Sequence, residues 1–378
     1  MKVAVITNHP GGNAGCEKLW IAVVASLVRK GWLAGVSMQP GEEIQDSRLR
    51  QLIDSGQLEL RVRNSELGRI LDRLKYRVLG VTSVRQTMNW LKKFMPDVVV
   101  LNQACNIDAR YWMTACREFK YRYVTISQCA AESIWPEDDH IDELLLGFQG
   151  AIKNYFVSHK NLDLTRRILG TDVANAEVCG NFYQVDYDVE LPWPETTTLQ
   201  FACVARLHPS SKGQDLLFDV LAEPQWRDRD FHLNLFGKGP NERSLRRLAM
   251  SLQLNEKVTF CGHLNSPEEI WKRNHVLVLP SRYEGKPLAI IEAMLCGRPV
   301  VTTDVAGNAE YIDHGVSGFV ASDATTAALR IALEDAWNAR QQFQEIGKTA
   351  ASAIRRPEIQ LVADLIASKI LIAAKQSN

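Results

Sequence analysis

The chain lacks the segments that mark several classes of protein. No run of about 18 apolar residues occurs, so we expect no helix that spans a membrane. Lys and Arg together number 44, as do Asp and Glu, so no net charge attracts nucleic acid to the protein. The eight cysteines form no C-x-x-C pair, which favours buried reduced thiols in a cytoplasmic protein over disulfides or zinc. Because Met1–Ile6 passes directly into a strand-like pattern, we also expect no signal peptide.

Two common ligand motifs are also missing or misplaced. The dinucleotide fingerprint G-x-G-x-x-G is absent. The D-x-D triplet at Asp228–Asp230 stands between a predicted helix and a predicted strand, at the wrong end of a sheet for a ligand. What the chain does have is 378 residues, 46% of them hydrophobic, which is enough for two hydrophobic cores of ordinary size.

The stretch from Pro280 to Gly318 shows the clearest organisation. An apolar run at 276–279 predicts a buried parallel strand, and the polar residues 281–286 predict a loop. Pro287 fits the first turn of a helix that Gly297 ends, and the next strand follows. In a strand–loop–helix–strand unit of this kind, the loop after the strand's carboxyl end faces the ligand.

Two carboxylates flank that position, Glu284 in the loop and Glu292 in the helix. An ionised carboxylate only accepts hydrogen bonds, so it suits the vicinal hydroxyls of a sugar or a ribose. The free backbone N–H groups of Leu288 and Ala289 suit a phosphate or a sugar oxygen. The alternative is that Glu284 caps the helix and Glu292 is a solvated helix residue.

The whole string S-R-Y-E-G-K-P-L-A-I-I-E-A-M-L-C-G-R-P-V-V, residues 281–301, resembles the donor-site signature of glycosyltransferase family 4. Its members are retaining enzymes of the GT-B fold, and the E-x7-E spacing from Glu284 to Glu292 is matched. The resemblance implies an α/β protein with two doubly wound, Rossmann-like parallel-sheet domains that face each other across a cleft. It implies that Glu284 binds hydroxyls of the donor sugar and Glu292 the ribose.

A second loop carries two cations, Arg206 and Lys212, after the predicted strand 199–205. Two cations at a helix N-terminus suit a nucleoside diphosphate, which gains charge when the sugar leaves. The alternative is ordinary surface charge. The string R-L-H-P-S-S-K-G is similar to the family's R-L-x-x-x-K-G signature, G-K-G-P at 237–240 to its G-x-G-P turn, and 258–264 to its loop near the nucleobase.

The glycine loop at 8–15 resembles the family's first loop, which is often G-G-x-E, with Cys16 in place of a glycine. Asn102 and Ser127 stand at the ends of two further predicted strands, where the family often has a histidine. The resemblance thus gives three groups of candidate residues. The catalytic group is Arg206, Lys212 and Glu284; the donor-binding group is Gly15, Gly237, Gly239, His263, Gly285, Lys286, Pro287, Leu288 and Glu292; the acceptor-side group is His9, Asn102, Ser127 and Gln128.

The chain is predicted to form two domains, an acceptor-side domain at 1–190 and a donor-binding domain at 191–355. The boundary rests on the proline-rich and threonine-rich composition of 192–198, which is typical of a linker. An apolar-rich helix at 361–374 ends the chain, and in GT-B proteins the segment 356–378 would cross back onto the first domain.

Residues 61–93 are locally basic. Solvated helices with basic outer faces account for this pattern, and the alternative is a surface that meets anionic lipid or an anionic acceptor. The cations of the segment are Arg61, Arg63, Arg69, Arg73, Lys75, Arg77, Arg85, Lys92 and Lys93.

The resemblance implies a retaining glycosyltransferase that moves a sugar from a nucleotide diphosphate sugar to a hydroxyl of a glycan, lipid or small molecule. Cell-envelope glycan or glycolipid synthesis is the expected setting, in the cytoplasm or on the inner face of the membrane. Neither a metal nor another cofactor is expected. Two alternatives stay open: a non-catalytic module of the same fold that binds a nucleotide or a partner, and a nucleotide-sugar epimerase.

Overall fold

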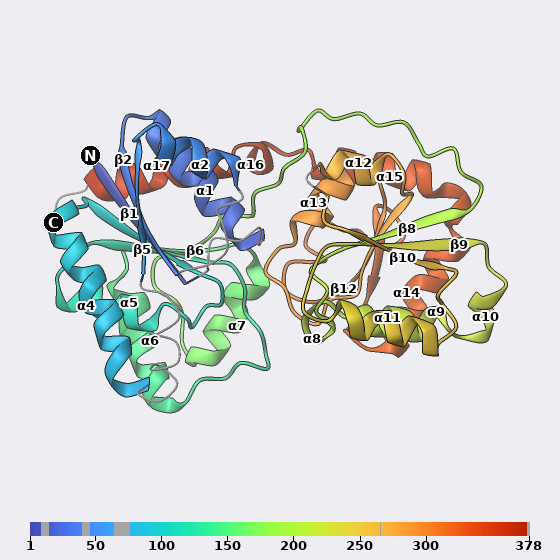
Figure 1. The fold of residues 1–378 in the computed structure, drawn as a ribbon, viewed down its shortest axis with the longest axis horizontal. Helices are drawn as coiled ribbons and strands as arrows, with labels where there is room; N and C mark the ends of the chain where they lie inside the picture. Colours follow the sequence, from blue (N-terminus) through green and yellow to red (C-terminus); the bar gives the residue numbers. More distant parts are fainter. Residues whose placement is uncertain (9–14, 40–45, 64–75, 265, 376–378) are drawn as a thin grey trace. The chain divides into compact units, whose positions relative to one another are not determined.

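The computed structural model describes residues 1–8, 15–39, 46–63, 76–264 and 266–375. Contacts between residues divide the chain into two compact units (Figure 1). Unit 1 comprises Met1–Phe182 and Leu361–Asn378, and unit 2 comprises Tyr183–Gln360. The contacts change unit between Phe182 and Tyr183, so the segment predicted as a linker, 192–198, lies within unit 2.

Unit 1 is built on a seven-stranded sheet in the order β3-β2-β1-β4-β5-β6-β7, in which every neighbouring pair is parallel. Its strands are β1 (Lys2–Thr7), β2 (Leu33–Met38), β3 (Leu58–Val62), β4 (Val98–Gln103), β5 (Tyr123–Ser127), β6 (Lys153–Phe156) and β7 (Ala176–Val178). Its helices are α1 (Gly15–Arg29), α2 (Ser47–Asp54), α4 (Tyr76–Phe94), α5 (Arg110–Glu118), α6 (Asp138–Gly150), α7 (His159–Leu169) and α17 (Val362–Lys375).

Alternating apolar residues give the sheet of unit 1 two buried faces. Val3 and Val5 of β1 pack in one core with residues of α1 and α17, whereas Ala4 and Ile6 pack in the other with residues of α4, α5 and α6. Figure 1 shows helices covering both faces of this sheet. Successive strand residues point to opposite faces, so a strand that is apolar throughout supplies both cores.

Unit 2 repeats this design on a six-stranded parallel sheet in the order β10-β9-β8-β11-β12-β13. Its strands are β8 (Leu199–Val204), β9 (Phe231–Phe236), β10 (Val258–Gly262), β11 (Val276–Leu279), β12 (Val300–Thr303) and β13 (Gly318–Ala321). Its helices are α8 (Pro209–Lys212), α9 (Gln214–Leu221), α10 (Pro224–Arg227), α11 (Glu242–Ser251), α12 (Pro267–Trp271), α13 (Leu288–Leu295), α14 (Thr326–Asn338), α15 (Phe343–Ile354) and α16 (Pro357–Gln360), with a 3-10 turn at Arg340–Gln342.

The two doubly wound parallel sheets confirm the predicted fold class. The strand expected at 276–279 is β11, with the same bounds. Pro287 differs slightly from the prediction, because it occupies the N-cap of α13 rather than its first turn. Asn102 and Ser127 were expected in loops, but both are paired within β4 and β5 because these strands extend further than their apolar runs.

The C-terminal helix α17 packs against α1 of the same unit, and its Val362, Ile366 and Ile370 join the core beneath α1. Asp364 of this helix accepts hydrogen bonds from Ser26 and, at 3.2 Å, from Arg29. Unit 1 is therefore built from both ends of the chain.

The basic segment at 61–93 does not form one solvated surface. Residues 64–75 lie outside the described residues. Arg85 and Lys92 are exposed, but Trp90 and Phe94 are buried in the core, and Arg63 is 5% exposed. The prediction of a basic outer face is therefore wrong for Arg63. Among the described residues, no helix is long and apolar enough to cross a membrane.

Candidate functional site

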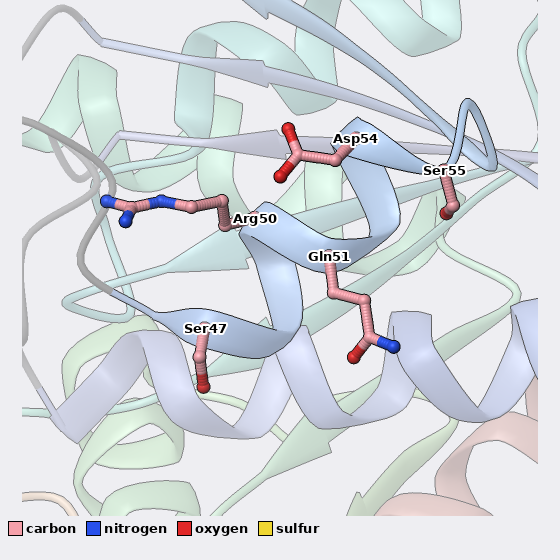
Figure 2. A pocket seen from close by; sticks show the side chains of 5 residues that line it. All are labelled: Ser47, Arg50, Gln51, Asp54 and Ser55. Atoms are coloured by element: carbon pink, nitrogen blue, oxygen red, sulfur yellow. The ribbon is translucent and has the colours of Figure 1, made fainter.

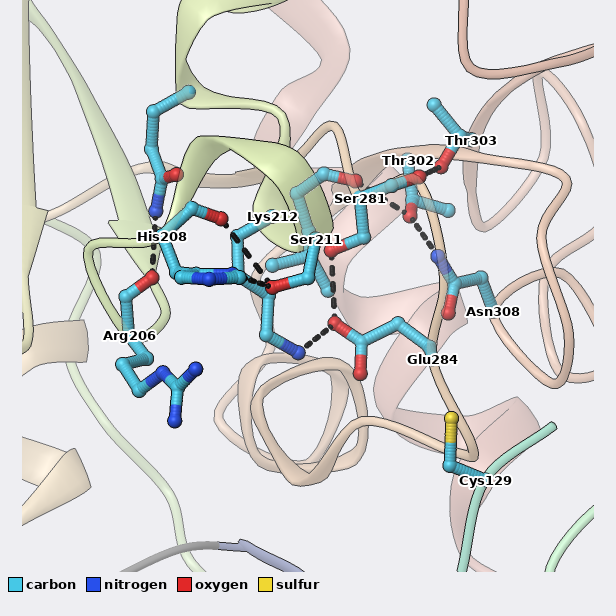
Figure 3. Close-up of polar contacts among 12 residues, drawn as sticks. Cys129, Arg206, His208, Ser211, Lys212, Ser281, Glu284, Thr302, Thr303 and Asn308 are labelled. Carbon is cyan, nitrogen blue, oxygen red and sulfur yellow. Dashed lines mark hydrogen bonds and ion pairs between the residues drawn. The ribbon is translucent and has the colours of Figure 1, made fainter. Parts of the chain in front are cut away.

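The strand order of unit 2 reverses at β8, which has β9 on one side and β11 on the other. Ligands of open parallel sheets bind outside the carboxyl ends of the strands at such a reversal. The loops that leave β8 and β11 there are 205–208 and 280–287, and they carry Arg206 and Glu284 of the predicted catalytic group. Lys212, the third member, ends the short helix α8 that follows the first loop. Figure 3 shows the polar contacts between these loops.

Lys212 and Glu284 meet directly, although they are far apart in the sequence. Nζ of Lys212 lies 2.5 Å from Oε1 of Glu284, and the hydroxyl of Ser281 donates to the same oxygen at 2.8 Å (Figure 3). Lys212 is the last residue of α8, and Glu284 is 8% exposed. The structure therefore joins the predicted phosphate-binding cation to the predicted sugar-binding carboxylate in one ion pair.

A second set of contacts holds the loop of Glu284 against α8 and α9. The backbone N–H groups of Arg282 and Tyr283 both donate to the carbonyl of Ser211, at 2.8 and 3.3 Å. The guanidinium of Arg282 binds both oxygens of Asp215, at 2.6 and 2.7 Å, and the carbonyl of Pro209 at 2.7 Å. Sequence reasoning missed this clamp, and only the Arg at the second position of S-R-Y-E-G was a signal for it.

The other side of the loop is attached to β12. Thr303 donates to the carbonyl of Ser281 at 2.6 Å, and Thr302 donates to the carbonyl of Leu279 at 2.8 Å. Asn308 in turn donates to the hydroxyl of Thr302 at 3.1 Å (Figure 3). The loop is thus fixed from both sides by residues that the sequence did not single out.

The backbone of the loop after β9 lies against the backbone of the loop after β8. A Cβ atom on Gly237 would stand 2.1 Å from the carbonyl oxygen of Ala205, and one on Gly239 2.3 Å from that of Leu207. No side chain fits at either position. The two predicted glycines therefore allow loops from neighbouring strands to meet at the carboxyl edge of the sheet.

The loop after β8 is electropositive. Arg206 is exposed, and its carbonyl accepts a hydrogen bond from Gln214 at 2.9 Å. His208 lies between the two cations, and its ring contacts Ser211 at 2.8 Å. Burial, followed by the charges of Arg206 and Lys212, lowers the pKa of His208. The two charges, unlike burial, also favour an anion beside them.

Two predicted donor-binding residues that follow Glu284 in the sequence, Lys286 and Glu292, are buried. Lys286 is 5% exposed, pairs with Glu310 at 2.7 Å, and lies 3.8 Å from the centre of the Tyr311 ring. Glu292 is 6% exposed, and its Oε1 accepts a hydrogen bond from the backbone N–H of Gln184 at 3.0 Å. Both side chains already have protein partners, so a ligand would bind them together with those partners.

Three further positions complete this part of the site. The carbonyl of Gly285 accepts from the N–H of Gly307 at 2.9 Å. Leu288 is the first residue of α13, directly after Pro287, and its backbone N–H is at the open end of the helix. His263 is exposed, just beyond β10.

The acceptor-side candidates lie at the carboxyl edge of the sheet of unit 1. Asn102 donates to the hydroxyl of Thr7 at 3.2 Å, and Gln128 donates to the side-chain oxygen of Asn102 at 3.0 Å. Ser127 accepts from Gln103 at 3.1 Å. The structure therefore brings Asn102, Ser127 and Gln128 together. Gly15 is the exposed first residue of α1, and His9 lies outside the described residues.

A shallow hollow elsewhere in unit 1 is a different feature. It is lined by one side of α2, with Ser47, Arg50, Gln51, Asp54 and Ser55 (Figure 2). None of the sequence-predicted residues lines it. In the described ranges, no three His, Cys, Asp or Glu side chains come together as a metal site would require.

Taken together, the loops of unit 2 can hold an anion and a hydroxylated group side by side. Arg206 and Lys212 offer positive charge after β8, and α13 begins with free N–H groups. Glu284 offers carboxylate oxygens beside them. This combination fits a sugar joined to a phosphate.

Comparison with known sequences supports this assignment for unit 2. Residues 198–338 match the sequence profile of glycosyl transferases group 1. The chain is 32% identical over 112 residues to an uncharacterized glycosyltransferase of Haemophilus influenzae. The aligned part is 29% of this chain and 32% of that protein. The chain is 26% identical over 169 residues to D-rhamnosyltransferase WbpZ of Pseudomonas aeruginosa, 43% of each. The chain thus matches less than half the length of these relatives.

Comparison with solved structures covers almost the whole chain. Alr3699/HepE of Anabaena in complex with UDP has a TM-score of 0.74 at 19% identity, over 98% of this chain and 100% of that one. Sucrose-phosphate synthase of Thermosynechococcus elongatus has a TM-score of 0.75 at 16% identity, over 99% and 100%. At such identities the likeness concerns the fold. The chain therefore has the GT-B fold, and its residues 198–338 are similar in sequence to the glycosyl transferases group 1.

Proposed function

We propose that the protein is a glycosyltransferase that moves a hexose from a nucleotide diphosphate sugar to a hydroxyl acceptor, with retention of the anomeric configuration. The observation that carries this proposal is the contact between Lys212 and Glu284 at the strand reversal of unit 2. A cation suited to phosphate and a carboxylate suited to hydroxyls lie there within one hydrogen bond of each other.

In this proposal Arg206 and Lys212 bind the diphosphate. They stabilise the negative charge that develops when the bond between the sugar carbon and the phosphate oxygen breaks. The departing phosphate oxygen takes the proton of the acceptor hydroxyl, whose oxygen bonds to the sugar on the same face. No protein nucleophile is then needed, and Glu284 orients the sugar through its hydroxyls.

The remaining donor residues have supporting roles in this proposal. Glu292 binds the ribose hydroxyls, and the N–H groups at Leu288 and Ala289 bind a phosphate or sugar oxygen. The other residues assigned to the donor are Gly15, Gly237, Gly239, His263, Gly285, Lys286 and Pro287. The reaction is proposed to require no metal, so chelation with EDTA should leave the rate unchanged.

Relatives suggest the setting of the reaction. A Vi polysaccharide biosynthesis protein of Salmonella typhi is 37% identical over 95 residues, and a poly(ribitol-phosphate) alpha-N-acetylglucosaminyltransferase of Staphylococcus aureus 26% over 150 residues. We therefore place the protein in cell-envelope glycan or glycolipid synthesis, in the cytoplasm. Contact with anionic membrane through 61–93 belongs to the same proposal, and salt-sensitive co-sedimentation with anionic but not neutral vesicles would support it.

The decisive experiment has two stages. Calorimetric titration with UDP, GDP and ADP identifies the base, and release of nucleoside diphosphate from the matching nucleotide sugars is then measured with acceptor extracts. Release that depends on an acceptor supports the proposal. Binding without turnover would favour a non-catalytic module. This alternative is considered because Asn102 and Ser127 stand where the family often has a histidine. An altered sugar formed without acceptor would favour an epimerase.

A further inference from the structure

Arg63 is a buried cation at the ligand-facing edge of unit 1. It directly follows β3, and its side chain reaches over the sheet to the end of β1, where Nη2 donates to the carbonyl of Thr7. Its Cζ lies 4.9 Å from the centre of the Trp112 ring. The residue is 5% exposed, so its position is set by packing.

The guanidinium of Arg63 is only partly satisfied. In the part of the chain that the structure describes, its Nη1 has no hydrogen-bond partner, and neither has the buried Nε of Arg61. No described carboxylate lies within ion-pair distance of either side chain. Two acids, Glu59 of β3 and Asp46 before α2, have other partners: Glu59 accepts from Trp90 at 2.6 Å, and Asp46 pairs with Lys18 and Arg48.

An uncompensated buried cation has a measurable consequence. Burial, followed by the charge of Arg61, lowers the pKa of Arg63 to about 10, so the guanidinium is still charged at neutral pH. Buried charges in proteins are normally paired, because desolvation of an isolated charge costs free energy. A bound anion would supply the missing partner of Arg63 and the missing acceptor for its Nη1.

Hydrogen bonds connect Arg63 to a group of buried amides. Thr7 accepts from Arg63 through its carbonyl and from Asn102 through its hydroxyl, and Gln128 donates to Asn102. Oε1 of Gln128 and Oε1 of Gln103 are buried without a partner among the described residues. Amide oxygens accept hydrogen bonds from hydroxyls. An anion-binding group and hydroxyl-binding groups thus share the carboxyl edge of β1, β4 and β5.

We propose that unit 1 binds an anionic hydroxyl acceptor, with the guanidinium of Arg63 on a carboxylate or phosphate group and the side-chain oxygens of Gln103 and Gln128 on its hydroxyls. The identification of this ligand as the acceptor rests on the proposed function. The anion site itself follows from the contacts of unit 1 alone.

The test compares charged and uncharged sugars of matched shape. Dissociation constants of glucuronate, glucose 6-phosphate and glucose are measured by NMR titration of the full chain at pH 7. One good charge-assisted hydrogen bond predicts that at least one charged sugar binds roughly tenfold to a hundredfold more tightly than glucose. The lower of the dissociation constants of glucuronate and glucose 6-phosphate shows whether the site prefers a carboxylate or a phosphate.

The matched variants are Arg63→Met and Arg85→Met. Arg63→Met keeps an unbranched side chain of similar length against Trp112 but removes the charge, and it should abolish the preference for the charged sugar. Arg85 is exposed on α4, so Arg85→Met makes the same change of net charge and should keep the preference. Thermal unfolding verifies that both variants are folded.

Two results would overturn the inference: equal or undetectable binding of all three sugars by the wild type, or an unchanged preference in Arg63→Met. An absent preference in the wild type overturns the inference without any variant, even where Arg63→Met disturbs unit 1. A preference in the wild type is assigned to Arg63 by its loss in Arg63→Met, because Arg206 and Lys212 of unit 2 are also proposed to bind phosphate. Titration with UDP, GDP and ADP runs in parallel. If the wild type binds none of these nucleotides, the proposed function is refuted. The preference for a charged sugar over glucose is measured independently of that result.

Discussion

The clamp between Arg282 and Asp215 should be required for turnover, although neither side chain is predicted to touch the donor. We consider Arg282→Ala. It removes two charge-assisted hydrogen bonds to Asp215 and one to the carbonyl of Pro209, but the N–H of residue 282 can still donate to Ser211. Loop docking is therefore weakened and not abolished.

The size of the effect follows from these contacts. A hydrogen bond to a charged group contributes about 1.5–3 kcal/mol, and both side chains are about one-third exposed, which screens the pair. We therefore expect a loss of about 1.5 kcal/mol in the docking of the loop, or roughly tenfold in population. Glu284 and Lys212 meet in the docked loop, so kcat/KM should fall, by at most about the same factor.

The assay is steady-state kinetics of nucleoside diphosphate release, combined with a double-mutant cycle of Arg282→Ala and Asp215→Ala. A coupling energy of about 1 kcal/mol in kcat/KM is expected, because the two residues act through one contact. Arg246→Ala is the control: Arg246 pairs with Glu242 at 2.8 Å on the exposed face of α11, and its loss should change kcat/KM by less than about twofold. Wild-type kcat/KM in Arg282→Ala would refute the reasoning.

Three further outcomes are expected. Lys212→Ala or Arg206→Ala should lower turnover roughly 10²-fold while thermal unfolding stays close to that of the wild type, since one charge partner of a developing anion is lost. Glu292→Ala should weaken binding of free nucleoside diphosphate, whereas Glu284→Ala should mainly impair use of the whole donor; equal weakening of the free nucleotide in both would show that the roles are misassigned. Burial raises the pKa of Asp46, but Arg48 and Lys18 outweigh it and lower the pKa to about 2, so this carboxylate stabilises the fold above pH ~4 and loses that effect as the pH falls towards 2. Asp46→Asn, which keeps the N-cap of α2, should therefore flatten the acid-unfolding profile between these values.

The strands that are continuous apolar runs could be predicted from the sequence. β11 is buried on both faces, and its bounds were predicted correctly. The short strand β3 was not predicted. Leu58 at its start is buried and Val62 at its end is exposed, so the strand has neither an apolar run nor a regular alternation of buried and exposed residues. Local pattern identifies a strand only where the surroundings of the strand are uniform.

The contents of the site were harder to predict than its place. Motif spacing pointed to Glu284 and Lys212, but their direct contact depends on how two loops pack, which spacing does not encode. In the sequence, nothing distinguishes Arg282 from any surface arginine. Its partner Asp215 lies in α9, far from this loop in the sequence. Arg63 was misplaced because its sequence neighbours, Val62 and Asn64, give no sign that the fold buries it.

The position of α17 bears on the order in which the protein matures during synthesis. Unit 2 is continuous in the chain, so all of it has been synthesised before α17 begins. The larger part of unit 1 precedes unit 2 in the sequence, yet the apolar side of α1 that α17 covers lacks this helix until residues 362–375 have been made. We therefore expect unit 1 to be completed after unit 2, and a released chain that ends at residue 360 should carry a protease-resistant unit 2 beside a protease-sensitive unit 1.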